Sequence, residues 1–141
     1  MKRTASAVWQ GGIKDGKGSI TTQSSVLSST QYSYSTRFEN GAGTNPEELI
    51  AAAHAGCFAM ALSAILGQSG ITAQEIDAQA AVSLEKSGDG FAITESHLKV
   101  TVKAPGSDKA AIEQALAAAK AGCPVSKVLN AKITLDSTVE N

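Results

Sequence analysis

The chain has 141 residues, of which 18% are charged, and its formal net charge is −1. That length can bury a core of its own, so we expect a single domain spanning residues 1–141. The near-neutral charge argues against nucleic acid or an anionic membrane surface as a partner. The N-terminal residues lack the apolar run of a signal peptide, so we expect a cytoplasmic protein with reduced cysteines.

The first 43 residues are expected to form short, polar strands. Residues 4–10 can form a first strand, and Asp15-Gly16 marks a tight turn. Residues 18–27 are rich in Ser and Thr, which suits exposed edge strands. Residues 28–38 alternate weakly, contain Arg37 and lead into a glycine-rich loop.

A long helix is predicted to begin at Asn45, which is placed to act as its N-cap. Pro46 follows at the first helical position, where its missing N–H costs nothing. Glu48 is expected to reach back to the backbone N–H of Asn45 and complete a capping box. Residues 49–66 are almost entirely apolar, so the helix should be buried on most sides.

Residues 49–66 also approach the length of a membrane-spanning helix. Many of them are Ala or Gly, which contribute little to insertion, and no basic flank follows. We therefore favour the core helix of a soluble protein over a membrane span.

The second half of the chain predicts a hairpin of strands, residues 78–85 and 91–104, joined by a loop at 87–90. In the second strand the apolar positions change from odd to even numbers. A regular strand cannot change parity, so we predict a β-bulge between Thr94 and His97.

Two further helices and a closing strand complete the pattern. Ser107 or Asp108 caps a helix that ends at Gly122, and its core stripe should be Ile112, Ala115, Leu116 and Ala119. Pro124 begins a short helix, and residues 132–139 form the last strand. This order of elements predicts an α+β fold with antiparallel pairing.

The two cysteines carry the strongest chemical signal. Cys57 lies too far inside its helix for the helix dipole to activate it, and burial would raise its pKa. A reactive Cys57 therefore requires a cation, and Arg37, just before the loop that enters the helix, is the candidate. Cys123 precedes Pro124 as an N-cap, where the dipole lowers a thiol pKa, so it is a natural resolving partner.

Other interpretations of the cysteines remain open. Both could be inert core residues, since buried free cysteine is common. They are too far apart in sequence for a C-x-x-C motif, and Cys and His are too few for a structural zinc site.

Two motifs together resemble the OsmC/Ohr family of osmotically inducible and organic hydroperoxide resistance proteins. They are Thr44-Asn45-Pro46-Glu47-Glu48-Leu49 with Ala55-Gly56-Cys57-Phe58, and Ala121-Gly122-Cys123-Pro124-Val125-Ser126. The resemblance covers nearly the whole chain. It implies an OsmC-like α+β fold in an intertwined homodimer with two central helices. It also implies a thiol peroxidase that acts on organic hydroperoxides without a metal or organic cofactor.

Carried over by position, Cys57 resembles the peroxidatic cysteine, Cys123 the resolving cysteine and Glu47 the catalytic glutamate. In the Ohr branch the activating arginine lies in the early glycine turn, where this chain has Lys14 and Lys17. The OsmC branch places it where Arg37 stands, so the chain resembles that branch more.

The residues themselves add a geometric constraint. Glu48 is assigned to the cap, which leaves Glu47 as the functional acid. Ten residues of helix span about 15 Å, so Glu47 cannot touch Cys57 on its own helix. Either Arg37 bridges them or the second chain of a dimer supplies one partner. His54 could polarise a leaving oxygen or could be a satisfied polar group at an interface.

The expected reaction is reduction of an organic hydroperoxide, and more weakly of hydrogen peroxide, through a Cys57 sulfenic acid and a Cys57–Cys123 disulfide. An external thiol or dithiol would then restore the enzyme. The alternatives are a thiol–disulfide or sulfur-transfer enzyme and a non-catalytic dimeric module whose cysteines are core residues.

Overall fold

The computed structural model describes residues 1–141 as two compact units, Met1–Leu49 and Ile50–Asn141. Both contain a sheet and at least part of a helix, which confirms the α+β class. The long helix α2, Pro46–Gln68, begins in the first unit and continues into the second.

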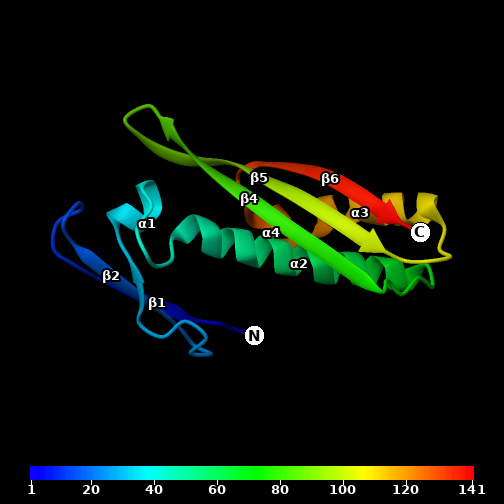
Figure 1. Cartoon of the computed structure of the whole chain (residues 1–141), viewed down its shortest axis with the longest axis horizontal. Coiled ribbons are helices and arrows are strands. Elements are labelled where there is room, and N and C mark those ends of the chain that lie inside the picture. Colours follow the sequence, from blue (N-terminus) through cyan, green and yellow to red (C-terminus); the bar gives the residue numbers. More distant parts are fainter. The chain divides into compact units, whose positions relative to one another are not determined.

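The first unit contains a three-stranded antiparallel sheet of order β1-β2-β3 (Figure 1). Its strands are β1 (Ala5–Gln10), β2 (Lys17–Thr22) and β3 (Thr30–Tyr32). A short helix α1, Tyr34–Phe38, follows and was not expected from the weak alternation of residues 28–38. Local capping explains it: the Ser33 hydroxyl accepts from the N–H of Thr36, and the Thr36 hydroxyl accepts from the N–H of Ser33.

The start of α2 confirms two of its three predicted features. Asn45 Oδ1 accepts the N–H of Glu48 at 2.8 Å, and Pro46 is the first helical residue. The third was wrong: the Glu48 carboxylate accepts the hydroxyl of Thr44 at 2.7 Å. The flexible Glu48 side chain takes that hydroxyl donor instead of the backbone N–H of Asn45.

The second unit contains a three-stranded sheet of order β4-β5-β6 with α2 running alongside it (Figure 1). Its strands are β4 (Glu75–Ser87), β5 (Gly90–Lys103) and β6 (Lys132–Glu140). β4 and β5 form the predicted antiparallel hairpin, whereas β6 pairs parallel to β5. The expectation of antiparallel pairing throughout was therefore wrong. The helices α3 (Lys109–Gly122) and α4 (Pro124–Val128) return the chain to the end of the sheet where β5 starts, as a parallel crossover requires.

The predicted bulge is present at the first position of its expected interval. Ser83 pairs with Glu95 and Leu84 with Ile93, which leaves Thr94 without a partner on β4. The extra residue shifts the buried positions of β5 to even numbers, as the sequence indicated. These positions are Ser96, Leu98, Val100 and Val102, all essentially inaccessible to solvent.

The core of the second unit lies between α2, β5 and α3. Its α2 members recur every fourth residue, at Phe58, Leu62 and Leu66, and the four expected residues of α3 are all buried. The opposite face of α2 is exposed, including Met60 at 78%. Burial of α2 on most sides is therefore not achieved within one chain.

By length and composition α2 could cross a membrane, and it is the one helix in the structure of which this is true. The core helix of a soluble protein meets the same criteria, so this finding is weak evidence for a span. The interpretation of α2 as a core helix accords with its buried stripe.

Candidate thiol site and arginine–glutamate pair

The structure brings the two cysteines into contact. The Sγ atoms of Cys57 and Cys123 are 2.9 Å apart, although 66 residues separate them in sequence. Both are free thiols; Cys57 is partly exposed and Cys123 is fully buried. Two sulfur atoms at this separation need only a small movement to form a disulfide.

Cys123 sits at the junction of two helices. Its N–H bonds to the carbonyl of Ala119 and ends α3, and Pro124 then begins α4. Burial tends to raise the pKa of the Cys123 thiol. The hydrogen bond with Cys57 lowers the pKa most, and smaller effects of Ser126 and Val125 add to it. Together they outweigh burial and leave the pKa below its ordinary value.

The expected lowering of the Cys123 pKa is therefore present, but it has a different main cause. The sequence argument relied on the dipole of the following helix. That helix has only five residues. The neighbouring hydrogen-bond donors, with Cys57 first among them, account for the lowered pKa instead.

The pKa of Cys57 shifts in the opposite direction, above its ordinary value. Burial raises its pKa, the hydrogen bond with Cys123 raises it further, and a bond from the N–H of Val125 lowers it only in part. This accords with the expectation that a mid-helix cysteine without a cation stays protonated. Within the second unit, Cys123 is therefore the thiol with the lower pKa.

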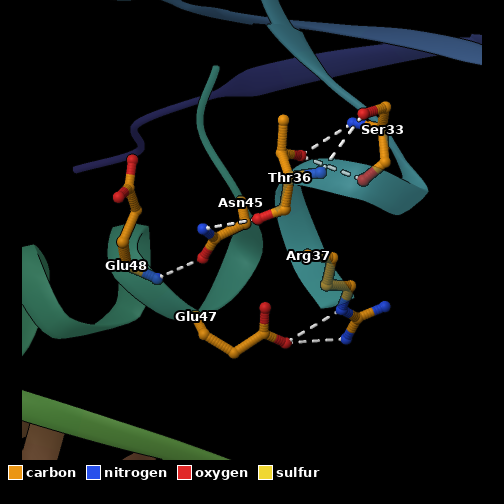
Figure 2. A network of polar contacts seen from close by, with 6 residues as sticks. All are labelled: Ser33, Thr36, Arg37, Asn45, Glu47 and Glu48. Carbon is orange, nitrogen blue, oxygen red and sulfur yellow. Dashed lines mark hydrogen bonds and ion pairs between the residues drawn. The ribbon is translucent and has the colours of Figure 1, made fainter. Parts of the chain in front are cut away.

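Arg37 and Glu47 form an ion pair in the first unit (Figure 2). The guanidinium Nε and one terminal nitrogen donate to the same carboxylate oxygen at 3.0 and 2.8 Å. Arg37 comes from α1 and Glu47 from the first turn of α2. Glu47 is nearly buried, with 11% of its side chain exposed against 38% for Arg37. The sequence analysis left Glu47 free of the helix cap and offered Arg37 as one possible bridge from it to Cys57; the structure pairs Glu47 with Arg37.

Further hydrogen bonds hold α1 and the start of α2 together around this pair. The Asn45 side chain donates to the carbonyl of Thr36 at 3.1 Å while it caps α2 (Figure 2). The Ser33–Thr36 capping box fixes the start of α1. Asn45 thus links the helix that carries Arg37 to the helix that carries Glu47.

An apolar cavity of about 260 Å³ lies beside Arg37 in the first unit. Four aromatic side chains line it, those of Trp9, Tyr32, Tyr34 and Phe38. An apolar group of a ligand could pack against these aromatic rings, and a polar group could bond to the guanidinium of Arg37. Lys14, one of the alternative cations, lies 5.9 Å from the centre of the Tyr34 ring.

His54 is fully buried in the second unit and both of its ring nitrogens are bonded. Nδ1 lies 2.6 Å from the hydroxyl of Ser96, and Nε2 lies 2.7 Å from that of Ser126. Burial lowers its pKa, so the ring is neutral at ordinary pH. Of the two expected roles, the structure supports a satisfied polar group, placed in the interior of the chain.

The two serines were not singled out from the sequence. Ser96 could have been, because it shares the even-numbered face of β5 with Leu98 and Val100. A lone polar residue on a buried face needs a partner. Ser126 carries no comparable signal.

The structure thus groups the four predicted site residues into two pairs, one in each unit. No group of three His, Cys, Asp or Glu side chains lies close enough to hold a metal ion. The fold and the thiol pair define a two-cysteine α+β protein that also contains an arginine–carboxylate ion pair.

Residues 39–138 match the family described as OsmC-like protein, and the chain belongs to this family. It is 54% identical over 136 residues to Peroxiredoxin OsmC of Escherichia coli (strain K12), covering 96% of this chain and 95% of that protein. An organic hydroperoxide resistance protein of Xanthomonas axonopodis pv. citri is 31% identical over 100 residues, covering 70% of this chain and 68% of that protein.

The fold is similar to the crystal structure of the organic hydroperoxide resistance protein OhrB of Bacillus subtilis. The TM-score is 0.73 at 30% identity, with 96% of this chain and 98% of that chain covered. The higher identity to the OsmC relative confirms the closer resemblance to that branch, which the position of Arg37 had indicated.

Proposed function

We propose that this protein is a thiol peroxidase that reduces organic hydroperoxides to alcohols, and hydrogen peroxide more weakly, in defence against oxidative and osmotic stress. The observation that carries the proposal is the 2.9 Å contact between Cys57 and Cys123 in a chain so similar to a peroxiredoxin. Similarity to an organic hydroperoxide resistance protein and the aromatic cavity beside Arg37 support an organic substrate.

The proposed reaction has two steps at the thiol pair. The Cys57 thiolate attacks the terminal peroxide oxygen; an S–O bond forms, the O–O bond breaks, and the alkoxide takes a proton and leaves as alcohol. Cys57 is then a sulfenic acid. Cys123 attacks its sulfur, an S–S bond forms and water leaves. An external thiol or dithiol reduces the disulfide by exchange.

Arg37 is the proposed activator of Cys57. Because burial raises the Cys57 pKa, attack requires a cation that stabilises the thiolate and the charge developing on the leaving oxygen. Glu47 holds the guanidinium through two donors, which leaves the other terminal nitrogen of Arg37 for the reaction. We assign Arg37 and Glu47 these roles whether the cysteine on which they act belongs to their own chain or to a second chain.

We propose that the active form is a homodimer of single 141-residue domains in the cytoplasm. The support is the uncovered apolar face of α2, which includes Met60 and Ala64, and the exposure of nearly all of β1. A second copy is the natural cover for such a surface.

The function is tested by mixing the protein with a dithiol and tert-butyl hydroperoxide. We expect one alcohol formed per dithiol oxidised, and slower turnover with hydrogen peroxide. Oxidation of the dithiol by a small disulfide with no response to hydroperoxide would instead establish a thiol–disulfide exchange enzyme. Absence of both reactions would favour a non-catalytic module.

A further inference from the structure

A second cavity, of about 340 Å³, lies within the second unit, and no step of the proposed reaction uses it. Residues of α3, α4 and β6 line it: Ala117, Lys120, Ala121, Ser126 and Ile133. Three of these five side chains are apolar, and the other two carry an ammonium group and a hydroxyl group. Its volume is at the lower end of the range typical of small-molecule sites. The two polar groups therefore determine which ligand the cavity suits.

Lys120 places a positive charge without a counter-charge beside this apolar lining. The residue is half-buried, yet it takes part in none of the ion pairs of the structure. No Asp or Glu lines the cavity. A half-buried ammonium group loses part of its hydration here and gains no partner in return, so it would attract an anion that enters the cavity.

Ser126 supplies the second polar group and is nearly buried, with 9% of its surface exposed. Its hydroxyl lies 2.7 Å from Nε2 of His54, the one hydrogen bond that the structure gives it. The other ring nitrogen, Nδ1, lies 2.6 Å from the hydroxyl of Ser96. Ser96 is fully buried, and its hydroxyl has no second partner. His54 is therefore bonded between a serine in the interior and a serine on the wall of the cavity.

The direction of these two hydrogen bonds follows from the single proton of a neutral imidazole. A fully buried hydroxyl group needs an acceptor for its hydrogen, so Ser96 donates to Nδ1 and the ring proton is on Nε2. The oxygen of Ser126 then accepts from His54, and the hydrogen of Ser126 is left for a different partner. Because Ser126 lines the cavity, a ligand bound there can accept that hydrogen.

We propose that this cavity binds a small carboxylate with an apolar body, of the class of short-chain fatty acids. One carboxylate oxygen accepts the hydrogen of Ser126, and the negative charge pairs with Lys120. The hydrocarbon part packs against Ala117, Ala121 and Ile133. The inference is independent of the proposed peroxidase activity, because none of these residues is among the reacting groups.

The first experiment titrates the reduced full chain with hexanoate and follows the backbone amide signals by NMR. We expect saturable shifts at the lining residues with a dissociation constant of about 1 mM or below, which a ligand of this size can reach. The uncharged analogue 1-hexanol should bind at least about tenfold more weakly, because it cannot form the charged contacts. Inorganic phosphate, which has charge but no hydrocarbon, should cause no saturable shift at these residues.

Three results of this titration would overturn the proposal. Absence of saturable shifts with hexanoate would show that the cavity is not a site for this ligand. Equal binding of 1-hexanol would show that the charge plays no part. Binding of phosphate as tight as that of hexanoate would show the same of the apolar lining.

Two matched pairs of variants then locate the site. Lys120→Gln should weaken hexanoate binding about tenfold and leave 1-hexanol binding unchanged, whereas Lys109→Gln, in the first turn of the same helix, should change neither. Ala117→Leu enlarges a side chain of the lining and should abolish binding of both ligands. Ala118→Leu, at an exposed neighbouring position outside the lining, is its control. Equal hexanoate affinity within either pair would overturn the proposal.

Ser126→Ala tests the hydroxyl group and should also weaken hexanoate binding about tenfold. The substitution leaves Nε2 of His54 without its partner, so circular dichroism must first show that the variant folds. Unchanged hexanoate affinity in a folded Ser126→Ala protein would contradict the assigned direction of the hydrogen bonds. If the variant does not fold, the pairs at Lys120 and Ala117 decide, since both substitutions are on the surface of α3.

Discussion

The Arg37 guanidinium donates two hydrogen bonds to a single carboxylate oxygen of Glu47, from Nε at 3.0 Å and from a terminal nitrogen at 2.8 Å. The planar guanidinium can make this arrangement and still keep another edge for a second partner, whereas an ammonium group cannot. The relationship therefore gives the proposed activator a fixed orientation. It also makes the conservative replacement of Arg37 informative.

Arg37→Lys is expected to slow hydroperoxide reduction by at least about tenfold, equivalent to about 1.4 kcal/mol in the barrier. Lysine keeps the positive charge but lacks the planar guanidinium that bonds Glu47 through two nitrogens. It would therefore be less firmly oriented toward the thiolate, and the pKa of Cys57 should rise. Iodoacetamide alkylation of Cys57 against pH, in a Cys123→Ser background, measures that pKa in both proteins. Arg3→Lys is the matched control, because Arg3 is exposed and bonds only to its neighbouring carbonyl. Identical alkylation curves and unchanged rates would exclude Arg37 and direct attention to Lys14 and Lys17.

Substitutions of the two cysteines are expected to stop the reaction at different steps. Cys57→Ser should abolish turnover, because no attacking thiolate remains. Cys123→Ser should complete one reduction and then stall with Cys57 oxidised, because the resolving thiol is missing. Mass spectrometry after one equivalent of tert-butyl hydroperoxide, with a sulfenic acid trap, distinguishes the two products. Continued turnover of Cys57→Ser with a dithiol reductant would show that the assignment of the attacking thiol is wrong.

Features set by neighbouring residues could be predicted from the sequence. The Asn45 cap, Pro46 at the first helical position and the Asp108 cap are local, and all three are present. The bulge at Thr94 was also predictable, since a change of parity in a strand allows few explanations. The capping box of α1 was present in the sequence as well, but the weak alternation around it favoured a strand.

Features set by packing between distant segments were less predictable. The parallel pairing of β6 depends on where α3 and α4 return the chain, which no local pattern encodes. The sequence predicted that the two cysteines act as a pair. Their 2.9 Å contact, and the hydrogen bond with Cys57 that lowers the Cys123 pKa, join residues 66 positions apart and could not be read from a local pattern. His54 stands out in the sequence as a polar residue within an apolar helix. Its partners Ser96 and Ser126 lie 42 and 72 residues further along the chain, so only the folded structure identifies them.

Met60→Glu is expected to convert the proposed homodimer to a monomer at micromolar concentration. Met60 is 78% exposed within one chain, so the substitution should leave the fold intact while placing a charge on the surface that the second copy would cover. Sedimentation velocity measures the change, and circular dichroism checks the fold. Val26→Glu, at a similarly exposed position outside α2, is the control. A parent protein that sediments as a stable, active monomer would contradict the homodimer directly.

The last prediction concerns stability in acid and depends on His54. Burial lowers its folded-state pKa below the unfolded value near 6.5, so the unfolded chain binds the additional proton. The contribution of neutral His54 to stability is therefore complete above about pH 6.5 and is lost as the pH falls through the folded-state pKa. Between pH 7 and pH 5 the free energy of unfolding should fall by at most about 2 kcal/mol from this residue.

Urea unfolding at several pH values tests this, with His54→Gln as the variant. Gln cannot titrate in this range but can bond to one of the two serines, so the variant should be less stable at pH 7 and less sensitive to acid. Carboxylates that titrate over the same range contribute to both proteins, so the difference between the two pH profiles isolates His54. Parallel profiles would mean that His54 takes up its proton equally in the folded and unfolded chain, which is incompatible with a neutral imidazole held between Ser96 and Ser126.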